Sequence, residues 1–141
     1  MALSRNQTHL VIMTVIYNEL ADFHYSDGQT FSRDAKELIQ DMVGDIPYEE
    51  IDQYIKDMVL ISLQKYGEIV NAYQPYLRNW KWDRLPLLTQ AILLMSYTHF
   101  YFVEKVDKKV VINIAVDLAK KYIDDKQAGF INAILDGGVL A

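Results

Sequence analysis

Two amphipathic helical patterns follow each other almost without a gap in the last part of the chain, KKVVINIAVDLAKKYIDDKQAGFINAILDGG. The first pattern continues to Tyr122–Ile123. The second begins at the acidic pair Asp124–Asp125 and stops at Gly137–Gly138, a typical helix end. The pattern therefore predicts two α-helices, the first starting near Asp107, that meet at a polar, glycine-containing seam, residues 122–130.

A helical period also runs through the rest of the sequence, and no sustained alternation of apolar and polar residues predicts a strand. Ser4 is a good N-cap for a long helix to about Asp22, apolar around most of its circumference. We expect a turn at 26–30 and further helices over about 32–42, 47–66 and 68–77 and from about Pro86. The sequence predicts an all-α fold of about seven helices in a single domain, 1–141.

Composition restricts the class of protein. Of the 141 residues, 51% are hydrophobic and 23% are charged, which is typical of a globular chain. The lack of cysteine excludes disulfides and thiol chemistry and fits a cytoplasmic location. No apolar run approaches the ~18 residues that a membrane span needs, and no signal-peptide pattern opens the chain, so no membrane association is expected.

The net charge of −5 argues against binding of nucleic acid through bulk charge. The charges are unevenly distributed, however. Residues 1–70 carry 5 basic and 12 acidic side chains, a balance of −7, and residues 71–141 carry 9 basic and 7 acidic side chains, a balance of +2. An anionic partner is therefore expected to prefer the C-terminal half.

Patterns typical of enzymes are missing. His9, His24 and His99 are dispersed, and none stands at the spacing of a metal motif. The acidic pairs Glu49–Glu50 and Asp124–Asp125 stand at expected helix starts, where carboxylates usually act as caps and dipole partners. The sequence contains no Gly-rich phosphate loop and no nucleophile elbow. We therefore expect no catalytic residue, no metal and no cofactor.

Two tryptophans, Trp80 and Trp82, stand among Arg78, Lys81 and Arg84 in the stretch RNWKWDR. Aromatic rings mixed with cations can stack bases and hold phosphates. The same tryptophans can instead anchor a connection between helices while the cations remain in solvent. The second interpretation is favoured at this stage because one short cluster is not a nucleic-acid motif.

The seam also has two interpretations. The acidic pair can cap the last helix and leave its first amide groups beside Lys120, Lys121 and Lys126, an arrangement suited to an RNA backbone. The small residues Ala128 and Gly129 would then let a flat ligand approach the backbone. A plain turn between two helices needs no ligand at all.

Residues 82–136 resemble the NusB family of bacterial transcription antitermination factors, through DRL, AILLMSYTHF, KVVINIAVDLAKKY and FINAILD in the family's order and spacing. The resemblance is weaker over the first helix, and residues 24–70 match only in helical character. It implies two packed three-helix bundles around a long first helix, and no catalysis. It also implies binding to single-stranded boxA-like RNA together with NusE, a small-subunit ribosomal protein, and through them an indirect contact with the RNA polymerase elongation complex.

The resemblance assigns RNA contacts to the N-terminal segment and to the seam. Phe130 and Asn132 match the seam motif, although a helical phenylalanine is by default a core residue, and nearby lysines supply positive charge. The candidate RNA-binding residues are Arg5, Lys120, Lys121, Asp125, Lys126, Phe130 and Asn132. The candidate partner-binding residues are Tyr17, which matches an aromatic residue near the partner surface, and Thr89 and Gln90, which replace a charged pair of the family.

The sequence also departs from the family. Of several N-terminal arginines only Arg5 remains, and the loss of about three phosphate contacts should weaken RNA binding more than tenfold at moderate salt. Ile114 stands where a glutamate is usual. An RNA-binding antitermination factor is the leading hypothesis. The alternatives are a protein-binding adaptor or homodimer of the same fold with weakened or lost RNA binding, and a detached RNA-recognition module like that found ahead of some ribosomal RNA methyltransferases.

Overall fold

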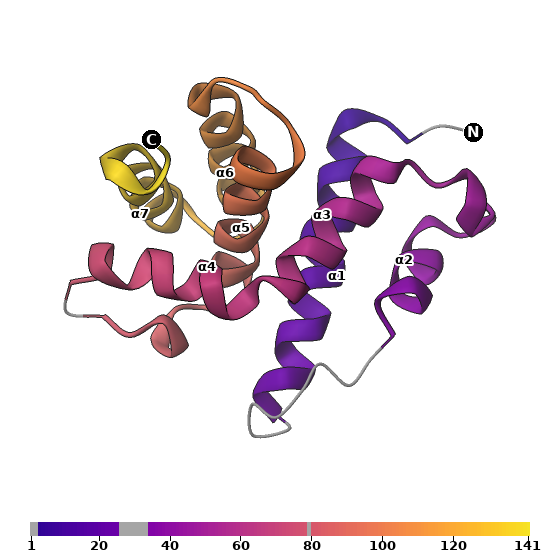
Figure 1. Ribbon diagram of the computed structural model, residues 1–141, viewed down its shortest axis with the longest axis horizontal. Coiled ribbons are helices and arrows are strands. Elements are labelled where there is room, and N and C mark those ends of the chain that lie inside the picture. Colours follow the sequence, from indigo (N-terminus) through magenta and orange to yellow (C-terminus); the bar gives the residue numbers. More distant parts are fainter. Residues whose placement is uncertain (1–2, 26–33, 79) are drawn as a thin grey trace.

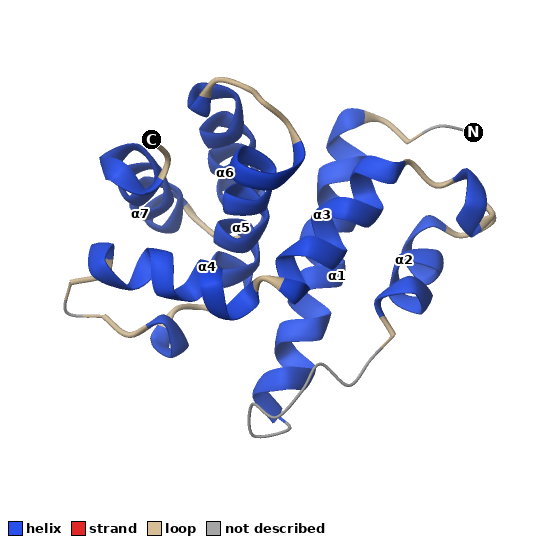
Figure 2. Cartoon of the chain, viewed as in Figure 1, coloured by secondary structure: helices blue, strands red, loops and turns tan. Residues whose placement is uncertain are grey.

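The computed structural model describes residues 3–25, 34–78 and 80–141, and these residues form seven α-helices and no strand (Figure 2). Short 3-10 and π-helical turns stand between or after them. The α-helices are α1 (Arg5–Tyr25), α2 (Ala35–Val43), α3 (Gln53–Gln64), α4 (Tyr66–Tyr73), α5 (Leu87–Thr98), α6 (Lys108–Tyr122) and α7 (Asp125–Ile134). The prediction of an all-α fold of seven helices is confirmed.

The first helix begins at a reciprocal cap. The Gln7 backbone N–H donates to Ser4 Oγ at 3.1 Å, and the Ser4 backbone N–H donates to Gln7 Oε1 at 2.8 Å. The helix then runs through the centre of the molecule, with α2 and α3 packed against it and α5 on another side (Figure 1). This central position explains why α1 is apolar around most of its circumference.

The remaining helices gather around α5, which contacts α1, α3, α4, α6 and α7. Most of its side chains are buried, and α6 and α7 pack closely on each other beside it (Figure 1). One group of helices thus surrounds α1, and a second group surrounds α5. This is the layout that the resemblance implied.

The start of α3 and the break before α4 differ from the expectation. Pro47 begins only a short 3-10 turn, Tyr48–Glu50, and α3 starts at Gln53 because Asp52 Oδ1 accepts a hydrogen bond from the Tyr54 backbone N–H at 3.0 Å. Gly67 lies inside α4 rather than at a break, since the chain turns at Lys65. The turn expected at 26–30 and the expected helix start near residue 32 lie outside the described residues.

Both helices of the C-terminal pair begin where the sequence predicts. Asp107 Oδ1 accepts a hydrogen bond from the Lys109 backbone N–H at 2.9 Å, and Asp124 Oδ1 accepts one from the Gln127 backbone N–H at 2.7 Å. After α7 a π-helical turn, Leu135–Val139, brings the chain back to the core through Val139 and Leu140. None of the helices in the described ranges is long and apolar enough to cross a membrane.

Candidate functional site

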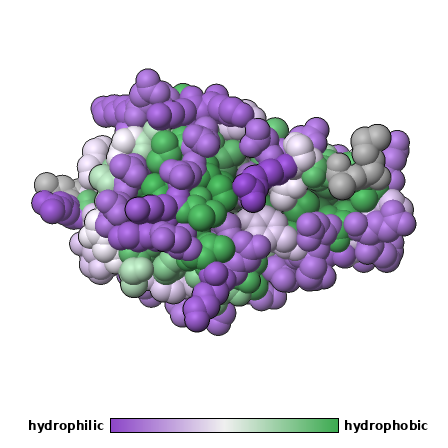
Figure 3. Space-filling model, turned by 90° about the horizontal axis from the view of Figure 1, so that it is seen from above, coloured by the Kyte–Doolittle hydropathy of each residue, from purple (hydrophilic) through white to green (hydrophobic). Residues whose placement is uncertain are grey.

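A groove of about 690 Å³ lies between the N-terminal end of α1, the start of α3 and one side of α6. We call it the α1–α6 groove. Arg5 and Lys121, two of the candidate RNA-binding cations from opposite ends of the chain, both line it. Figure 3 shows apolar surface between hydrophilic side chains on the face of the molecule seen from above. Tertiary structure therefore brings together part of the predicted site.

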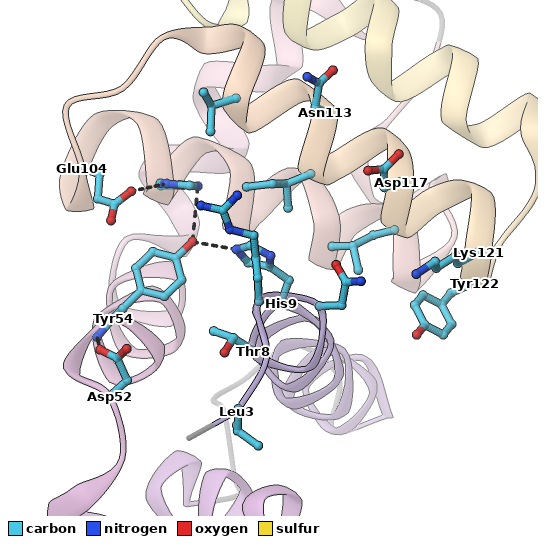
Figure 4. A pocket seen from close by; sticks show the side chains of 16 residues that line it. Leu3, Thr8, His9, Asp52, Tyr54, Glu104, Asn113, Asp117, Lys121 and Tyr122 are labelled. Carbon is cyan, nitrogen blue, oxygen red and sulfur yellow. Dashed lines mark hydrogen bonds and ion pairs between the residues drawn. The ribbon is translucent and has the colours of Figure 1, made fainter. Parts of the chain in front are cut away.

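One wall of the groove carries a chain of polar contacts (Figure 4). His9 Nε2 lies 3.1 Å from the Tyr54 hydroxyl, which lies 3.4 Å from His99 Nδ1, and His99 Nε2 lies 2.9 Å from Glu104 Oε2. These four residues come from α1, α3, the π-helical turn His99–Val103 and the segment after it. The chain of contacts therefore links the helices around α1 to those around α5.

The hydrogen-bond partners along this wall determine which atoms carry the protons. An ionised Glu104 carboxylate only accepts, so His99 Nε2 donates to it and, in the neutral ring, His99 Nδ1 accepts from the Tyr54 hydroxyl. The Tyr54 oxygen then accepts from His9 Nε2. Every polar hydrogen along the wall is used in this arrangement, which fixes the orientation of the three rings.

Burial keeps His9 and Tyr54 of this wall uncharged. Burial is the largest cause that lowers the pKa of His9 to about 4, and the neighbouring His99 and Arg5 lower it further. Burial likewise raises the pKa of the Tyr54 hydroxyl, and the charge of Glu104 raises it further. At neutral pH both groups are therefore neutral hydrogen-bonding groups.

The opposite wall is the side of α6 that carries Asn113, Ile114, Asp117, Lys121 and Tyr122. Tyr122 is 42% exposed at the last turn of α6, where its ring faces the groove. Ile114 is half-buried and gives this wall an apolar surface. The wall thus offers an aromatic ring, an amide and a cation close to the seam (Figure 4).

The charges of the groove are mixed. Arg5 and Lys121 face three carboxylates, those of Asp52, Glu104 and Asp117. Two of the carboxylates have structural contacts, since Glu104 meets His99 and Asp52 caps α3. The groove therefore offers hydrogen-bonding and stacking groups more than a strong positive potential.

The other predicted RNA-binding residues lie on or beside the seam and do not line the groove. Lys120, Asp125, Lys126 and Asn132 are exposed, while Phe130 is half-buried and packs against the core. Of the small residues, only Gly129 is exposed with open space around it, whereas Ala128 is buried. Their roles in RNA binding stay predictions.

The start of α7 is not the open anion site that the seam hypothesis required. The Asp124 carboxylate already occupies it by accepting from the Gln127 backbone N–H, and Asp125 adds a second negative charge in the first turn. Two carboxylates at a helix start satisfy its dipole and repel a phosphate. Any phosphate contact at the seam must therefore come from the lysine side chains.

Two of the three predicted partner-binding residues are buried. Thr89 is 0% exposed and its hydroxyl donates to Gln127 Oε1 at 2.8 Å, while Gln90 is 3% exposed and its amide donates to the carbonyl oxygens of Trp82 and Leu85. These contacts tie α5 to α7 and to the preceding loop. Tyr17 is half-buried against the core. Thr89 and Gln90 therefore shape the interior rather than offer the charged surface that the resemblance implied.

A second hollow, of about 430 Å³, lies at the C-terminal end of α1 against α4 and α5. We call it the α1–α5 hollow. Apolar and aromatic residues line part of it, and the rings of Phe23 and Tyr66 meet there edge to face at 5.3 Å. His24 and Asp83 add polar groups to the lining. Leu20 and Leu87 also line it, together with the buried Gln90.

Sequence reasoning missed Tyr54, Tyr122 and Phe23 as candidate functional residues. No motif in the sequence marks these residues. Each is only a large aromatic residue near a helix end, where the apolar stripe gives way to polar residues. His9 and His99, which match no metal motif in the sequence, form hydrogen bonds in the wall of the groove.

Comparison with known proteins agrees with this architecture. A family model described as the NusB family matches residues 5–138. The chain belongs to the NusB family. The family membership predicted from the sequence is thereby confirmed.

Several relatives are named transcription antitermination protein NusB. The one from Clostridium kluyveri is 38% identical over 94 residues, which cover 66% of this chain but only 59% of that protein. The one from Natranaerobius thermophilus is 32% identical over 115 residues, 79% of this chain and 80% of that protein. A crystal structure of the antitermination factors NusB and NusE in complex with double-stranded RNA matches with a TM-score of 0.72 at 22% identity, over 94% of this chain and 93% of the other.

Proposed function

We propose that this protein is a cytoplasmic transcription antitermination factor that binds single-stranded, boxA-like RNA together with a small-subunit ribosomal protein acting as NusE. In this proposal the RNA occupies the α1–α6 groove and the ribosomal protein occupies the α1–α5 hollow. The two partners then connect the chain indirectly to the RNA polymerase elongation complex. Membership of the NusB family and the names of the relatives support this assignment.

The observation that carries the RNA part is the meeting of Arg5, Lys121 and Tyr122 in one groove. Two cations and an exposed ring that line the same groove supply phosphate contacts and a stacking surface, the usual elements of single-strand recognition. Asn113 and Asp117 on the same wall can hydrogen-bond base edges. Because Lys121 and Tyr122 stand where α6 meets the seam, a strand leaving the groove there passes Lys120 and Lys126.

The observation that favours a protein partner at the other end of α1 is the lining of the α1–α5 hollow. Phe23, Tyr66 and Leu87 present aromatic and aliphatic surface in a concave site, and aromatic anchors of this kind dominate protein interfaces. Tyr17 lies on the same helix. Gln90 lines the hollow from within the fold, whereas Thr89 bonds to Gln127 and holds α5 against α7.

A second candidate function is an adaptor or homodimer that has this fold and has lost most RNA affinity. The groove itself favours this candidate to some degree, because three carboxylates face its two cations. Such an assembly would be insensitive to salt, whereas RNA binding weakens steeply as salt rises.

The decisive experiment is a titration of labelled boxA-type RNA with the full chain, with and without the ribosomal protein. The titration is repeated for Lys121→Gln, for Lys120→Gln on the neighbouring position outside the groove, and for Lys36→Gln on the distant helix α2. We expect a complex at low salt, weakened most by Lys121→Gln, less by Lys120→Gln and not by Lys36→Gln. The absence of any complex at low salt, with or without the partner, would contradict the proposal.

A further inference from the structure

The two tryptophans of the segment between α4 and α5 have opposite environments. Trp82 is 2% exposed, and its ring packs at 5.6 Å from that of the fully buried Tyr73. Trp80, two residues earlier, is 57% exposed. The interpretation of the tryptophans as anchors therefore holds for Trp82, while Trp80 presents a large apolar ring to solvent without contributing to the core.

The backbone holds Trp80 in place. Its N–H donates to the Leu77 carbonyl oxygen at 3.0 Å, and its own carbonyl oxygen accepts from the Gln74 side-chain amide at 3.2 Å. Leu77 and Trp82 on either side of it are both buried. The exposed ring thus projects from a segment that is fixed at both ends, so little ordering would be required when a ligand stacks on it.

Cations surround this ring. Residues 78–84 contain Arg78, Lys81 and Arg84 against the single carboxylate of Asp83, a balance of +2 in a chain whose net charge is −5. All three cations are exposed, and none takes part in an ion pair within residues 3–25, 34–78 and 80–141. A local excess of positive charge on an acidic protein favours an anionic ligand at this place.

Arg78 has an unusual backbone conformation, with φ of 54°. A side chain in the left-handed region carries a conformational cost that glycine would avoid. Arginine nevertheless stands here beside the exposed ring, and its long guanidinium side chain reaches solvent. Arg78→Gly therefore tests the charge alone, because glycine keeps the backbone conformation while it removes the guanidinium.

We propose that Trp80, with Arg78, Lys81 and Arg84, forms a second RNA-binding site, which stacks one base of single-stranded RNA and holds the adjoining phosphates. This segment follows α4 on the left side of Figure 1, whereas the N-terminal end of α1, which borders the α1–α6 groove, lies right of centre at the top. Because every base has a stacking face, the site tolerates any sequence. The site extends the proposed function but does not require that RNA also binds in the groove.

The chain has two tryptophans, one exposed and one buried, which permits a direct optical test. The full-length protein is titrated at low salt with short oligo-uridylate, and tryptophan emission and affinity are measured together. We expect RNA to quench the solvent-exposed, red-shifted emission of Trp80. Trp80→Leu should abolish the quenching and weaken binding roughly tenfold, the usual effect of losing one stacked base.

Three further variants complete the test. Arg78→Gly should weaken binding a few-fold and reduce the salt slope by about 0.7, the value for one phosphate contact on a single strand. Phe102→Leu, at another exposed aromatic residue, should bind as the unchanged chain does. Lys121→Gln, in the groove, should retain the quenching of Trp80.

Three results would overturn the second site: emission that does not change at saturating oligo-uridylate, a Trp80→Leu variant that binds as tightly as the unchanged chain, or Trp80 emission that responds only to the ribosomal protein. The last result would assign the surface to a protein. In each case boxA-type RNA could still bind the groove, so that failure of this site and failure of the proposed function are distinguishable.

Discussion

The two ends of α1 offer contrasting chemistry. The N-terminal end carries Arg5 and the polar His9, which meet Tyr54 and the residues of α6 in the α1–α6 groove. The C-terminal end carries Leu20 and Phe23, which meet Tyr66 in the apolar α1–α5 hollow. Both ends belong to one continuous helix of the same period. The difference therefore arises from the helices that each end meets, and it places the proposed RNA site and the proposed protein site at opposite ends of one helix.

The largest expected effect is a loss of folding stability in acid, caused by His9 at the polar end of α1. Because the pKa of His9 is lowered from 6.5 to about 4, the unfolded chain binds the proton more readily than the folded chain between these values. A neutral His9 contributes at most about 3 kcal/mol to the free energy of unfolding. This contribution is fully present above about pH 6.5 and is lost as the pH falls to 4. Urea unfolding at a series of pH values measures this loss.

The matched control for that measurement is His9→Gln, which keeps a donor for Tyr54 but cannot take up the proton. The pH dependence of the free energy of unfolding should be shallower in this variant than in the unchanged chain. Equal slopes for both proteins would show that carboxylates rather than His9 govern the acid sensitivity.

The next effect concerns the apolar end. Phe23→Ala should weaken binding of the ribosomal protein about 30-fold, or about 2 kcal/mol, since it removes an aromatic anchor from the α1–α5 hollow. RNA affinity should not change. Titration calorimetry measures both affinities. Thermal unfolding of Phe23→Ala and of the milder variant Phe23→Leu shows whether weaker binding comes from the lost contact or from lost stability. A Phe23→Ala variant that loses RNA but keeps the ribosomal protein would reverse the assignment of the two ends.

The reciprocal change at the polar end is the pair Arg5→Gln and Lys121→Gln. We expect RNA binding to weaken about tenfold at low salt and the salt slope to fall by about 1.4, as for two lost contacts with a single strand. Fluorescence anisotropy over a salt series provides both values. Binding of the ribosomal protein should remain as in the unchanged chain, and an unaltered salt slope would count against the groove.

The smallest effect tests the seam, which lies outside both ends. A Cβ added at Gly129 meets no atom within 4 Å, so Gly129→Ala should stabilise α7 by about 0.5–1 kcal/mol. Chemical unfolding measures this gain, and RNA affinity should stay within about threefold of the unchanged chain. A tenfold loss of RNA affinity would instead place the RNA backbone against the seam rather than in the groove.

Local sequence signals located most of the helices. Ser4, Asp107 and Asp124 begin helices as predicted because a capping side chain acts within three residues of its own position. The start of α3 was wrong by several residues, because Pro47 and Asp52 are both plausible starts and only packing selects between them.

The candidate site followed from the sequence only in part. Arg5 and Lys121 were chosen for charge and resemblance, but nothing local indicates that they share a groove. Thr89 and Gln90 were predicted to bind the partner, yet their polar side chains are satisfied inside the fold. Trp80 and Trp82 are identical residues two positions apart, and the sequence does not show which one is buried.

The sequence by itself determined the helical class, the caps and the family, because these depend on periodicity, on short-range hydrogen bonds and on motifs of fixed spacing. The tertiary structure alone decided which side chains meet. Burial and the joining of Arg5, His9, Tyr54 and Lys121 in one groove depend on contacts between segments far apart in the chain. Such contacts follow from how whole helices pack, and no local spacing encodes them.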